Sequence, residues 1–453
     1  MTFQSLGLSK SVLDALASKN YDTPTPIQLQ SIPALLEGND LLGIAQTGTG
    51  KTAAFMLPSI DRLVKANERR KPMRCRMLVL APTRELASQI ADSARAYAQY
   101  TKLTVATVFG GTPIARNRRD TAAGVDILVA TPGRLMDLID QRCLSLSDLE
   151  ILVLDEADQM LDLGFIHTLR KIVAMLPRDR QSLFFSATMP KTIRELADQF
   201  LTDPVEVRVT PASTTVERID QYVTFVNQTE KQYLLTLFVQ RNEIERALIF
   251  TRTKHGADRV VKLLAASGIA ANAIHGNKSQ PQREKALAEF RSGKVTLLVA
   301  TDIAARGIDV PGVSHVINFE LPNVAEQYVH RIGRTARAGA DGIAFAFCAE
   351  DERPYLRSIE KLTRSRIEPV ALPANFTAEI DRIKSTRVGP IPAERPDRPR
   401  QEQGPRRPRA THAAKPAGAG AGRPGGGNRR GGRPGGGGGR PGGGSRPHAQ
   451  SRG

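Results

Sequence analysis

The sequence predicts an α/β protein that contains two parallel sheets, and three observations support this. Short apolar segments rich in β-branched residues recur between longer stretches compatible with helices. These segments show no apolar-polar alternation, which is typical of strands covered on both faces, as in a parallel sheet with flanking helices. The segments also form two series, separated by a stretch rich in Thr, Pro and Ser around residue 212. We therefore expect two α/β domains in succession.

The expected strands define the domain boundaries. The first series lies at residues 77–82, 126–132, 150–158 and 182–188, and the second at 247–253, 296–302, 315–322 and 342–348. We place the first domain at residues 1–208, a linker at 209–215 and the second domain at 216–370. Residues 371–390 follow as a C-terminal extension, and residues 391–453 form a tail.

The tail carries most of the excess positive charge. The 453-residue chain has a net charge of +18, and residues 391–453 contribute +11 of it through 13 Arg, one Lys and three acidic residues. The tail also holds 18 of the 38 Gly and contains few large apolar side chains, so we predict that it is disordered. The charge balance favours a polyanionic partner, either nucleic acid or an acidic membrane surface.

The cysteines and the apolar runs indicate the compartment. Cys75, Cys143 and Cys348 are far apart and lack a CxxC spacing, so reduced thiols are favoured over a disulfide or a zinc site. The N-terminal segment does not resemble a signal peptide. No apolar run approaches the ~18 residues that a membrane span needs. We expect a cytoplasmic protein with no membrane partner.

The strongest local motif is AQTGTGKT, which follows the apolar segment DLLGIA. It fits the P-loop spacing GxxxxGK[ST], with Ala45 in place of the first Gly. Gly48 and Gly50 allow backbone N–H groups to point toward phosphates at a helix N-terminus. Lys51 is expected to reach the β- and γ-phosphates, and the Thr52 hydroxyl to ligate Mg²⁺. The predicted nucleotide-binding residues of this motif are Ala45, Gln46, Thr47, Gly48, Thr49, Gly50, Lys51 and Thr52. The alternative is a Gly/Thr-rich turn that binds no ligand.

A P-loop requires a second acidic residue near the metal, and LVLDEAD provides one after an apolar run. We expect Asp155 to hold Mg²⁺ and Glu156 to orient and deprotonate the attacking water. Acidic residues at this position also suit an ordinary solvated helix N-terminus. Their place downstream of a P-loop favours the catalytic interpretation.

With these motifs, the chain resembles the DEAD-box RNA helicase family over nearly all of residues 1–370. Further motifs occur in the order typical of the family, and Phe3 lies at the expected distance upstream. They are NYDTPTPIQ (20–28), PTREL (82–86), GG (110–111), TPGR (131–134), SAT (186–188), IFTRT (249–253), QPQR (280–283), ATDIAARGID (300–309) and HRIGRTAR (330–337). The segment after DEAD and the Arg/Gly-rich tail most resemble the bacterial RhlE-type branch. The resemblance implies two tandem RecA-like domains.

The resemblance also implies roles around ATP. Gln28 reads adenine, because its amide offers a donor and an acceptor together, and Tyr21 stacks on the base. The alternative for Tyr21 is a buried core tyrosine. Asp309 holds the ribose, and Arg334 and Arg337 act as arginine fingers toward the γ-phosphoryl group. A solvated basic face is the ordinary interpretation of such an arginine-rich run. Coupling of the nucleotide state to RNA falls to Ser186, Thr188 and His330.

The RNA contacts implied by the resemblance lie in both domains and address sugar and phosphate rather than bases, so one strand is bound without sequence preference. The residues are Pro82, Thr83, Arg84, Gly110, Gly111, Thr131, Gly133, Arg134, Arg252, Arg283, Thr301 and Gly307. Two positions depart from the family pattern, since Asn20 and Ala336 occupy sites where Gly is usual. We expect modest effects from both.

The predicted function is RNA-stimulated ATP hydrolysis that drives domain closure and local unwinding of short RNA duplexes or remodelling of RNA–protein complexes. ATP and Mg²⁺ are the expected cofactors, and RhlE-type relatives suggest ribosome precursors or a ribonuclease complex as partners. Two alternatives remain. One is a DNA-directed translocase built on the same paired domains, and the other is an RNA-annealing chaperone that acts through the basic tail.

Overall fold

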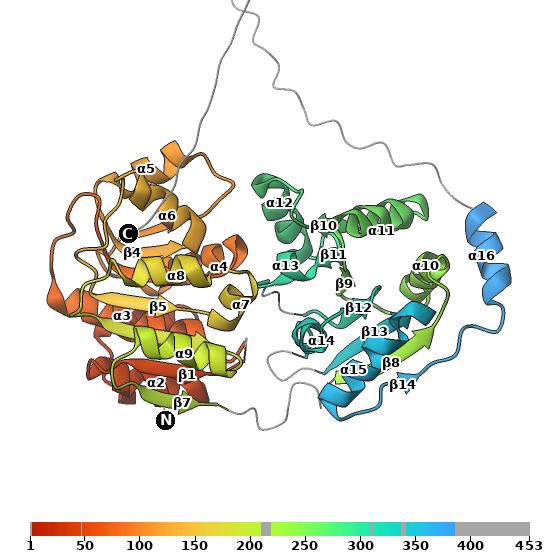
Figure 1. Cartoon of the computed structure of the whole chain (residues 1–453), viewed down its shortest axis with the longest axis horizontal. Coiled ribbons are helices and arrows are strands. Elements are labelled where there is room, and N and C mark those ends of the chain that lie inside the picture. The colour runs from red at the N-terminus through yellow and green to blue at the C-terminus, as the bar shows by residue number, and fades with distance from the viewer. Residues whose placement is uncertain are drawn as a thin grey trace, which may run out of the picture. The chain divides into compact units, whose positions relative to one another are not determined.

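The computed structural model of the chain describes residues 2–46, 48–209, 219–308, 310, 312–336 and 341–385. These residues form two sheets, each with helices on both faces (Figure 1). Every strand pairing in both sheets is parallel, which confirms the predicted fold class. No helix among the described residues is long and apolar enough to cross a membrane.

The first domain contains a seven-stranded sheet with the order β3-β4-β2-β5-β6-β1-β7. Its strands are β1 (Leu41–Ile44), β2 (Cys75–Leu80), β3 (Val105–Val108), β4 (Val125–Ala130), β5 (Ile151–Leu154), β6 (Gln181–Ser186) and β7 (Val205–Arg208). Its helices are α1 (Lys10–Ala17), α2 (Pro26–Leu36), α3 (Lys51–Ala66), α4 (Arg84–Tyr97), α5 (Ile114–Ala122), α6 (Pro132–Asp140), α7 (Ala157–Asp162), α8 (Ile166–Val173) and α9 (Lys191–Phe200), after a short 3₁₀ helix, η1 (Phe3–Leu6).

The second domain repeats this plan with the strand order β10-β11-β9-β12-β13-β8-β14. Its strands are β8 (Ile219–Phe225), β9 (Ala247–Thr251), β10 (Asn272–Ile274), β11 (Leu297–Thr301), β12 (His315–Asn318), β13 (Gly342–Cys348) and β14 (Glu368–Pro369). Its helices are α10 (Lys231–Arg241), α11 (Lys254–Ala266), α12 (Gln280–Arg291), α13 (Asp302–Ala305), α14 (Ala325–Ile332), α15 (Arg353–Thr363) and α16 (Phe376–Ser385), with the 3₁₀ helix η3 (Glu350–Glu352) before α15.

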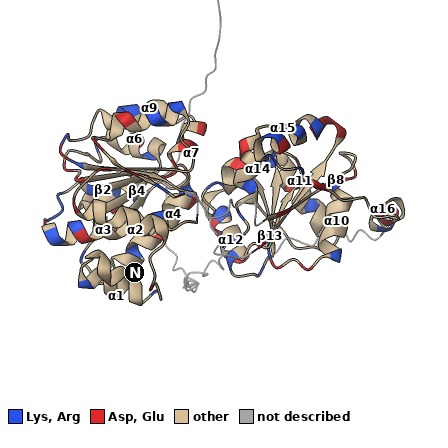
Figure 2. Cartoon of the chain, turned by 90° about the horizontal axis from the view of Figure 1, so that it is seen from below, with Lys and Arg blue, Asp and Glu red and all other residues tan. Residues whose placement is uncertain are grey.

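Apolar side chains fill both faces of each sheet. In the first domain, Phe185 of β6 packs on one face and Phe184 on the other, and both are fully buried. Gly43 of β1 is required here, because a Cβ atom at this position would lie 2.5 Å from the Phe185 ring. Charged residues lie mainly on the covering helices and loops, whereas the strands carry few of them (Figure 2).

The strand order places functional segments together. Strands β5, β6 and β1 are neighbours, so the segments that follow them meet at the carboxyl edge of the first sheet. These segments hold Asp155, Thr188 and the P-loop. Strands β9, β12 and β13 are likewise neighbours in the second domain.

The predicted segments outside the sheets have different outcomes. Most of the predicted linker, 209–215, and the whole tail, 391–453, lie outside the described residues. In the C-terminal extension, α16 buries Phe376, Ile380 and Ile383 in an apolar cluster shared with α10. An ion pair of 2.8 Å between Arg241 and Glu379 joins the same two helices. The described part of the extension is therefore packed onto the second domain.

Candidate active site

The P-loop joins β1 to α3 and has the conformation that its glycines predict. Gly48 and Gly50 have φ values of +85° and +94°, in the left-handed region that favours glycine. The Lys51 ammonium donates a hydrogen bond of 3.0 Å to the Ala45 carbonyl, and the Thr49 hydroxyl donates one of 2.8 Å to Gln46. These bonds hold the loop as a turn before the N-terminus of α3, where phosphate is favoured. Thr47 lies outside the described residues.

Gln28, the predicted adenine reader, lies against this loop. Its Oε1 accepts a hydrogen bond of 2.9 Å from the Thr25 backbone, and its Nε2 donates one of 3.0 Å to the Gly50 carbonyl. A Cβ atom on Gly50 would lie 2.5 Å from that Nε2, so glycine is needed for this close approach as well as for φ. An amide offers two N–H groups and two lone pairs, and these bonds use half of them. Base recognition by Gln28 stays a prediction.

A cavity of about 630 Å³ opens beside the P-loop, and Phe3, Tyr21, Gln28 and Lys51 are among its lining residues. Tyr21 is 45% exposed, so the alternative of a buried core tyrosine is wrong. Its ring centroid lies 6.5 Å from that of Tyr97. Aromatic side chains and the phosphate-binding loop therefore line the same cavity.

Asp155 and Glu156 lie at the carboxyl end of β5, each only 2% exposed. Burial raises the pKa of Asp155 to about 6, although the nearby Lys51 ammonium favours the carboxylate. The Lys51 Nζ lies 4.0 Å from Asp155 Oδ1, and among the described residues this oxygen has no hydrogen-bond partner. Glu156 has φ +55°, a strained value for a residue other than glycine.

This arrangement is compatible with a divalent cation. A buried carboxylate oxygen without a hydrogen bond is energetically unfavourable unless a ligand or ion completes it. Thr52 and Asp155 both line the cavity and supply the hard oxygen ligands that Mg²⁺ prefers. The described residues contain no group of three or more His, Cys, Asp or Glu that could hold a metal by itself. A cation here would therefore depend on nucleotide and water for its other ligands.

The SAT segment after β6 is bound to the last acidic residue of DEAD. Asp158 Oδ2 accepts hydrogen bonds from the Ala187 and Thr188 backbones at 3.2 and 3.0 Å and from the Thr188 hydroxyl at 3.1 Å. The Ser186 hydroxyl donates a hydrogen bond of 2.8 Å to the Thr188 carbonyl. Ser186 and Thr188, two of the predicted coupling residues, thus lie together with the DEAD segment.

In the second domain, Arg334 is 5% exposed and donates to the carbonyls of Ile308 and His330, at 3.1 and 3.3 Å. Burial lowers the pKa of His330, which favours the neutral imidazole. The interpretation of this run as a solvated basic face is wrong for Arg334, because its side chain is buried. Arg337 and Asp309 lie outside the described residues.

Four of the predicted RNA contacts in the first domain lie in one group. A Cβ atom on Gly111 would lie 2.1 Å from Arg84 Nη1, so the guanidinium packs directly on the Gly110–Gly111 turn. Arg134 Nη1 donates a hydrogen bond of 2.8 Å to the carbonyl of Thr112, which follows Gly111 in the chain. Arg84 at the start of α4, the glycine turn and Arg134 on α6 therefore form one surface.

The remaining predicted contacts lie at helix starts or turns. Thr83 and Thr131 are the N-cap residues of α4 and α6, and Thr301 is that of α13. Pro82 directly precedes Thr83. Gly133 lies next to open space, since no atom would lie within 4 Å of an added Cβ.

The other contacts predicted in the second domain are Arg252, Arg283 and Gly307. Arg283 on α12 is 9% exposed and donates 3.3 Å to the His275 carbonyl. Gly307 has φ +71°. Arg252 follows β9 and retains 25% exposure of its side chain.

Comparison with known proteins identifies the family. Residues 25–196 match the DEAD/DEAH box helicase family, and residues 229–339 match the helicase conserved C-terminal domain. The chain is 44% identical to the RNA helicase CrhR of Synechocystis sp. over 384 residues, which cover 84% of this chain and 77% of CrhR. The chain belongs to the DEAD-box RNA helicase family. It is an ATP-dependent RNA helicase, which confirms the predicted function and enzyme class.

Other members of the DEAD-box family agree in sequence and fold. The ATP-dependent RNA helicase CshA of Limosilactobacillus reuteri is 42% identical, over 82% of this chain and 74% of its own. The structure of S. cerevisiae Dbp5 bound to RNA and ADP BeF3 has a TM-score of 0.73 and 29% identity, and the match covers 85% of this chain and 99% of Dbp5. The structure of Mss116p bound to ssRNA and AMP-PNP has a TM-score of 0.76 and 26% identity, and the match covers 86% of this chain and 82% of the Mss116p chain. The tandem RecA-like fold is confirmed, whereas the RhlE-type branch stays a prediction.

Two features of this helicase's machinery were missing from the sequence-based site. No role was predicted for Asp158, the last residue of the DEAD motif, whereas its carboxylate accepts hydrogen bonds from the SAT segment. Arg331, within the HRIGRTAR segment, is 1% exposed and forms a two-pronged ion pair with Asp302, at 2.6 and 2.7 Å. Its position between His330 and Arg334, two predicted functional residues, was the available signal.

Proposed function

We propose that Lys51, Thr52, Asp155 and Glu156 form the hydrolytic site of this DEAD-box helicase. The observation that carries the proposal is the buried Asp155–Glu156 pair at the end of β5, with the Lys51 ammonium 4.0 Å from Asp155. Lys51 binds the β- and γ-phosphates, and Glu156 accepts a proton from the attacking water. Thr52 and Asp155 would hold Mg²⁺, which neutralises charge on the phosphates when bound.

We further propose that Gln28 and Tyr21 select adenine, and that Arg334 and Arg337 stabilise charge on the γ-phosphoryl group after the domains close. ATP and a single RNA strand both favour the closed state, and the strand is held by sugar and phosphate contacts. The packing of Arg84 on the Gly110–Gly111 turn supports a continuous phosphate-binding surface in the first domain. Hydrolysis and phosphate release then reopen the domains and free the strand.

The decisive experiment compares Glu156→Gln with Glu150→Gln. Glu156 follows β5, whereas Glu150 precedes the same strand and pairs with Arg76 at 2.5 Å, so it is a matched control. Glu156→Gln is expected to lower RNA-stimulated ATPase activity at least 100-fold, because general-base catalysis contributes roughly 10²–10⁴. Glu150→Gln is expected to leave it within about twofold. Equal ATPase rates of the unchanged protein with and without RNA would contradict the proposal.

The alternatives predict different substrates. A DNA-directed translocase would be stimulated by DNA oligonucleotides at least as strongly as by RNA. An annealing chaperone would pair complementary RNA strands without ATP and lose this activity when residues 391–453 are deleted. For the helicase, that deletion is expected to leave ATPase activity and to give weaker, less salt-sensitive RNA binding, because the tail carries +11 of the net charge.

We also propose a cytoplasmic role on ribosome precursors or in a ribonuclease complex. The basis is the resemblance to the RhlE-type branch. Crosslinking RNA to the protein in cells, followed by sequencing of that RNA, tests the first partner class. Purification of the intact protein with its bound partners tests the second.

A further inference from the structure

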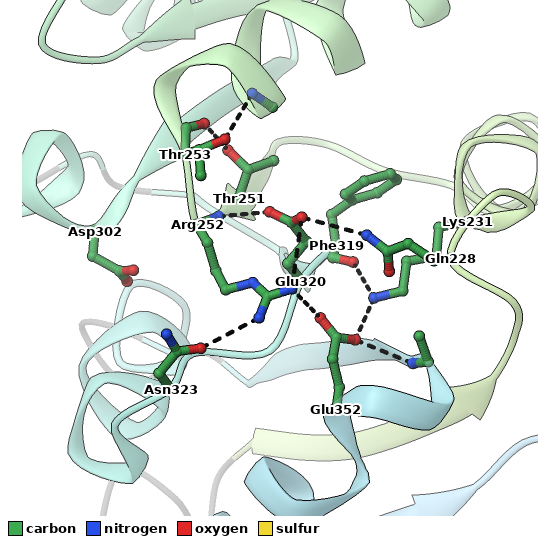
Figure 3. Close-up of polar contacts among 12 residues, drawn as sticks. Gln228, Lys231, Thr251, Arg252, Thr253, Asp302, Phe319, Glu320, Asn323 and Glu352 are labelled. Carbon is green, nitrogen blue, oxygen red and sulfur yellow. Dashed lines mark hydrogen bonds and ion pairs between the residues drawn. The ribbon is translucent and has the colours of Figure 1, made fainter.

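Four charged side chains meet at the carboxyl edge of the second sheet, beside β9, β12 and β13 (Figure 3). Two are cations, Lys231 and Arg252, and two are carboxylates, Glu320 and Glu352. Only Arg252 belongs to the predicted RNA contacts. The other three have no role in the proposed reaction, so their arrangement needs its own explanation.

Lys231 and Glu352 form a buried ion pair, and both side chains are 0% exposed. Lys231 is the first residue of α10, and its Nζ also donates 3.0 Å to the Phe319 carbonyl. Glu352 ends η3, and the Oε2 that bonds Lys231 also accepts 3.1 Å from the Ala349 backbone. Lys231 therefore fixes the position of the Glu352 carboxylate.

The second oxygen of Glu352 points toward Arg252. Glu352 Oε1 lies 3.4 Å from Arg252 Nη2, and it has no hydrogen-bond partner among the described residues. On the other side of the guanidinium, Nη1 donates 3.3 Å to Asn323 Oδ1. The Arg252 backbone N–H donates 2.7 Å to Glu320 Oε2, which anchors the main chain at the same residue. Arg252 is thus held by its backbone and by two of its nitrogens.

A purely structural role explains this cluster less well. Buried ion pairs seldom stabilise a fold more than apolar side chains of similar size, because both charges must leave water. The buried oxygen that faces Arg252 adds nothing to the contact between η3 and α10, which Oε2 already makes. The position of Glu352 Oε1 is explained if this oxygen orients the Arg252 guanidinium.

We propose that Glu352, fixed by Lys231, is a positioning residue for RNA binding, because it orients the Arg252 guanidinium toward the phosphate backbone. An arginine side chain loses considerable rotamer freedom when it grips a phosphate, and prior orientation reduces that loss. The guanidinium has five N–H donors, so the contacts of Nη2 with Glu352 and of Nη1 with Asn323 leave other donors for phosphate. This inference rests on the proposed role of Arg252 as an RNA contact.

A double-mutant cycle on the full chain tests the proposal. The measured quantity is the concentration of a single-stranded oligouridylate RNA that half-saturates ATPase stimulation, together with kcat. Arg252→Ala and Glu352→Gln are each expected to raise that concentration roughly two- to tenfold, with a smaller change in kcat. The double variant is expected to match Arg252→Ala alone, because Glu352 acts through Arg252.

The controls separate positioning from folding. Glu150→Gln breaks a partly exposed ion pair in the first domain and is expected to leave the half-saturating RNA concentration unchanged. If Glu352→Gln does not fold, Lys231→Met combined with Glu352→Gln removes both buried charges and keeps similar side-chain volumes. This pair of substitutions is expected to raise the half-saturating concentration as Glu352→Gln would.

Two results would overturn the inference, and they are distinguishable. In the first, Arg252→Ala raises the half-saturating concentration but the folded Glu352 variants do not, or the double variant shows the product of the two single increases in that concentration. The positioning role of Glu352 is then wrong, and the Arg252 contact stands. If Arg252→Ala changes nothing, the Arg252 contact in the proposed function is wrong, and the positioning role falls with it.

Discussion

The Asp158 carboxylate and the Thr188 hydroxyl are joined by a hydrogen bond of 3.1 Å, which connects the DEAD segment to the SAT segment. The same Asp158 oxygen accepts the backbone N–H groups of Ala187 and Thr188. Asp158 is 8% exposed, so these donors have little access to water as a substitute partner. These hydrogen bonds link the first turn of α7 directly to the segment after β6.

Replacement of Asp158 by Ala is expected to destabilise the first domain. It leaves the backbone N–H groups of Gln159, Ala187 and Thr188 and the Thr188 hydroxyl without their acceptor, and each buried unpaired group costs about 1–3 kcal/mol. Two such groups alone cost about 2 kcal/mol or more, which corresponds to a fall of at least roughly 4–8 °C in the melting temperature of a domain of this size. Thr188→Val removes only the hydroxyl bond and serves as the smaller control. Calorimetry of both variants checks the order, and equal melting temperatures would contradict it.

The two departures from the family pattern have a common conformational basis. Asn20 has φ +56° and Ala336 has φ +53°, so both adopt the left-handed conformation that glycine adopts most easily. Asn tolerates this region, whereas Ala is strained there by roughly 1–2 kcal/mol. The expectation of modest effects therefore suits Asn20 better than Ala336.

Ala336→Gly is expected to stabilise the second domain by up to about 1 kcal/mol. The strain is relieved, but the greater freedom of Gly in the unfolded chain offsets roughly 0.5–1 kcal/mol of the gain. Ala336→Val is the matched control and is expected to lower stability, because a β-branched residue is strained further at this φ. Urea unfolding of the three proteins measures the effect, and a stability order other than Gly, Ala, Val would contradict it.

The central strands could be predicted from sequence because they are buried on both faces. Strands β2, β4, β5 and β6 are buried at every residue, and each contains an uninterrupted apolar run of three or four residues. Strands β3, β7 and β8 were not predicted, since each mixes buried with more exposed positions and includes polar residues. Strands β10 and β14 have only three and two residues, too few to show a pattern.

The phosphate-binding part of the site could be predicted, because the spacing of residues within one short loop determines its geometry. The left-handed glycines and the Lys51 position follow from the spacing of the P-loop. The contacts of Gln28 with Gly50 and of Glu352 with Arg252 join residues 22 and 100 positions apart. Such partners are set by strand order and helix packing, which a single sequence does not display.

The three cysteines are expected to differ sharply in reactivity. Burial raises the pKa of Cys75 to about 12 and that of Cys348 to about 11, whereas Cys143 is partly exposed. Since the thiolate is the reactive form, a disulfide reagent at pH 8 should modify one thiol rapidly in the native protein. All three should react in denaturant, and Cys143→Ser should abolish the fast phase. If two or more thiols reacted in the fast phase, the fold would open at the buried cysteines, and the prediction would be wrong.

His315 is expected to make the second domain less stable in mild acid. It lies in β12, 7% exposed, and burial lowers its pKa below the ordinary value of 6.5. The unfolded chain therefore binds a proton at His315 more readily than the folded chain does. Its contribution to stability is complete above pH 6.5 and is lost as pH falls from 6.5 through the lower folded pKa. His315→Gln, which does not titrate, should show a smaller fall in the free energy of unfolding between pH 7.5 and pH 5. Urea unfolding at both pH values measures this difference, and an identical fall in the two proteins would mean that His315 is equally protonated in the folded and unfolded states.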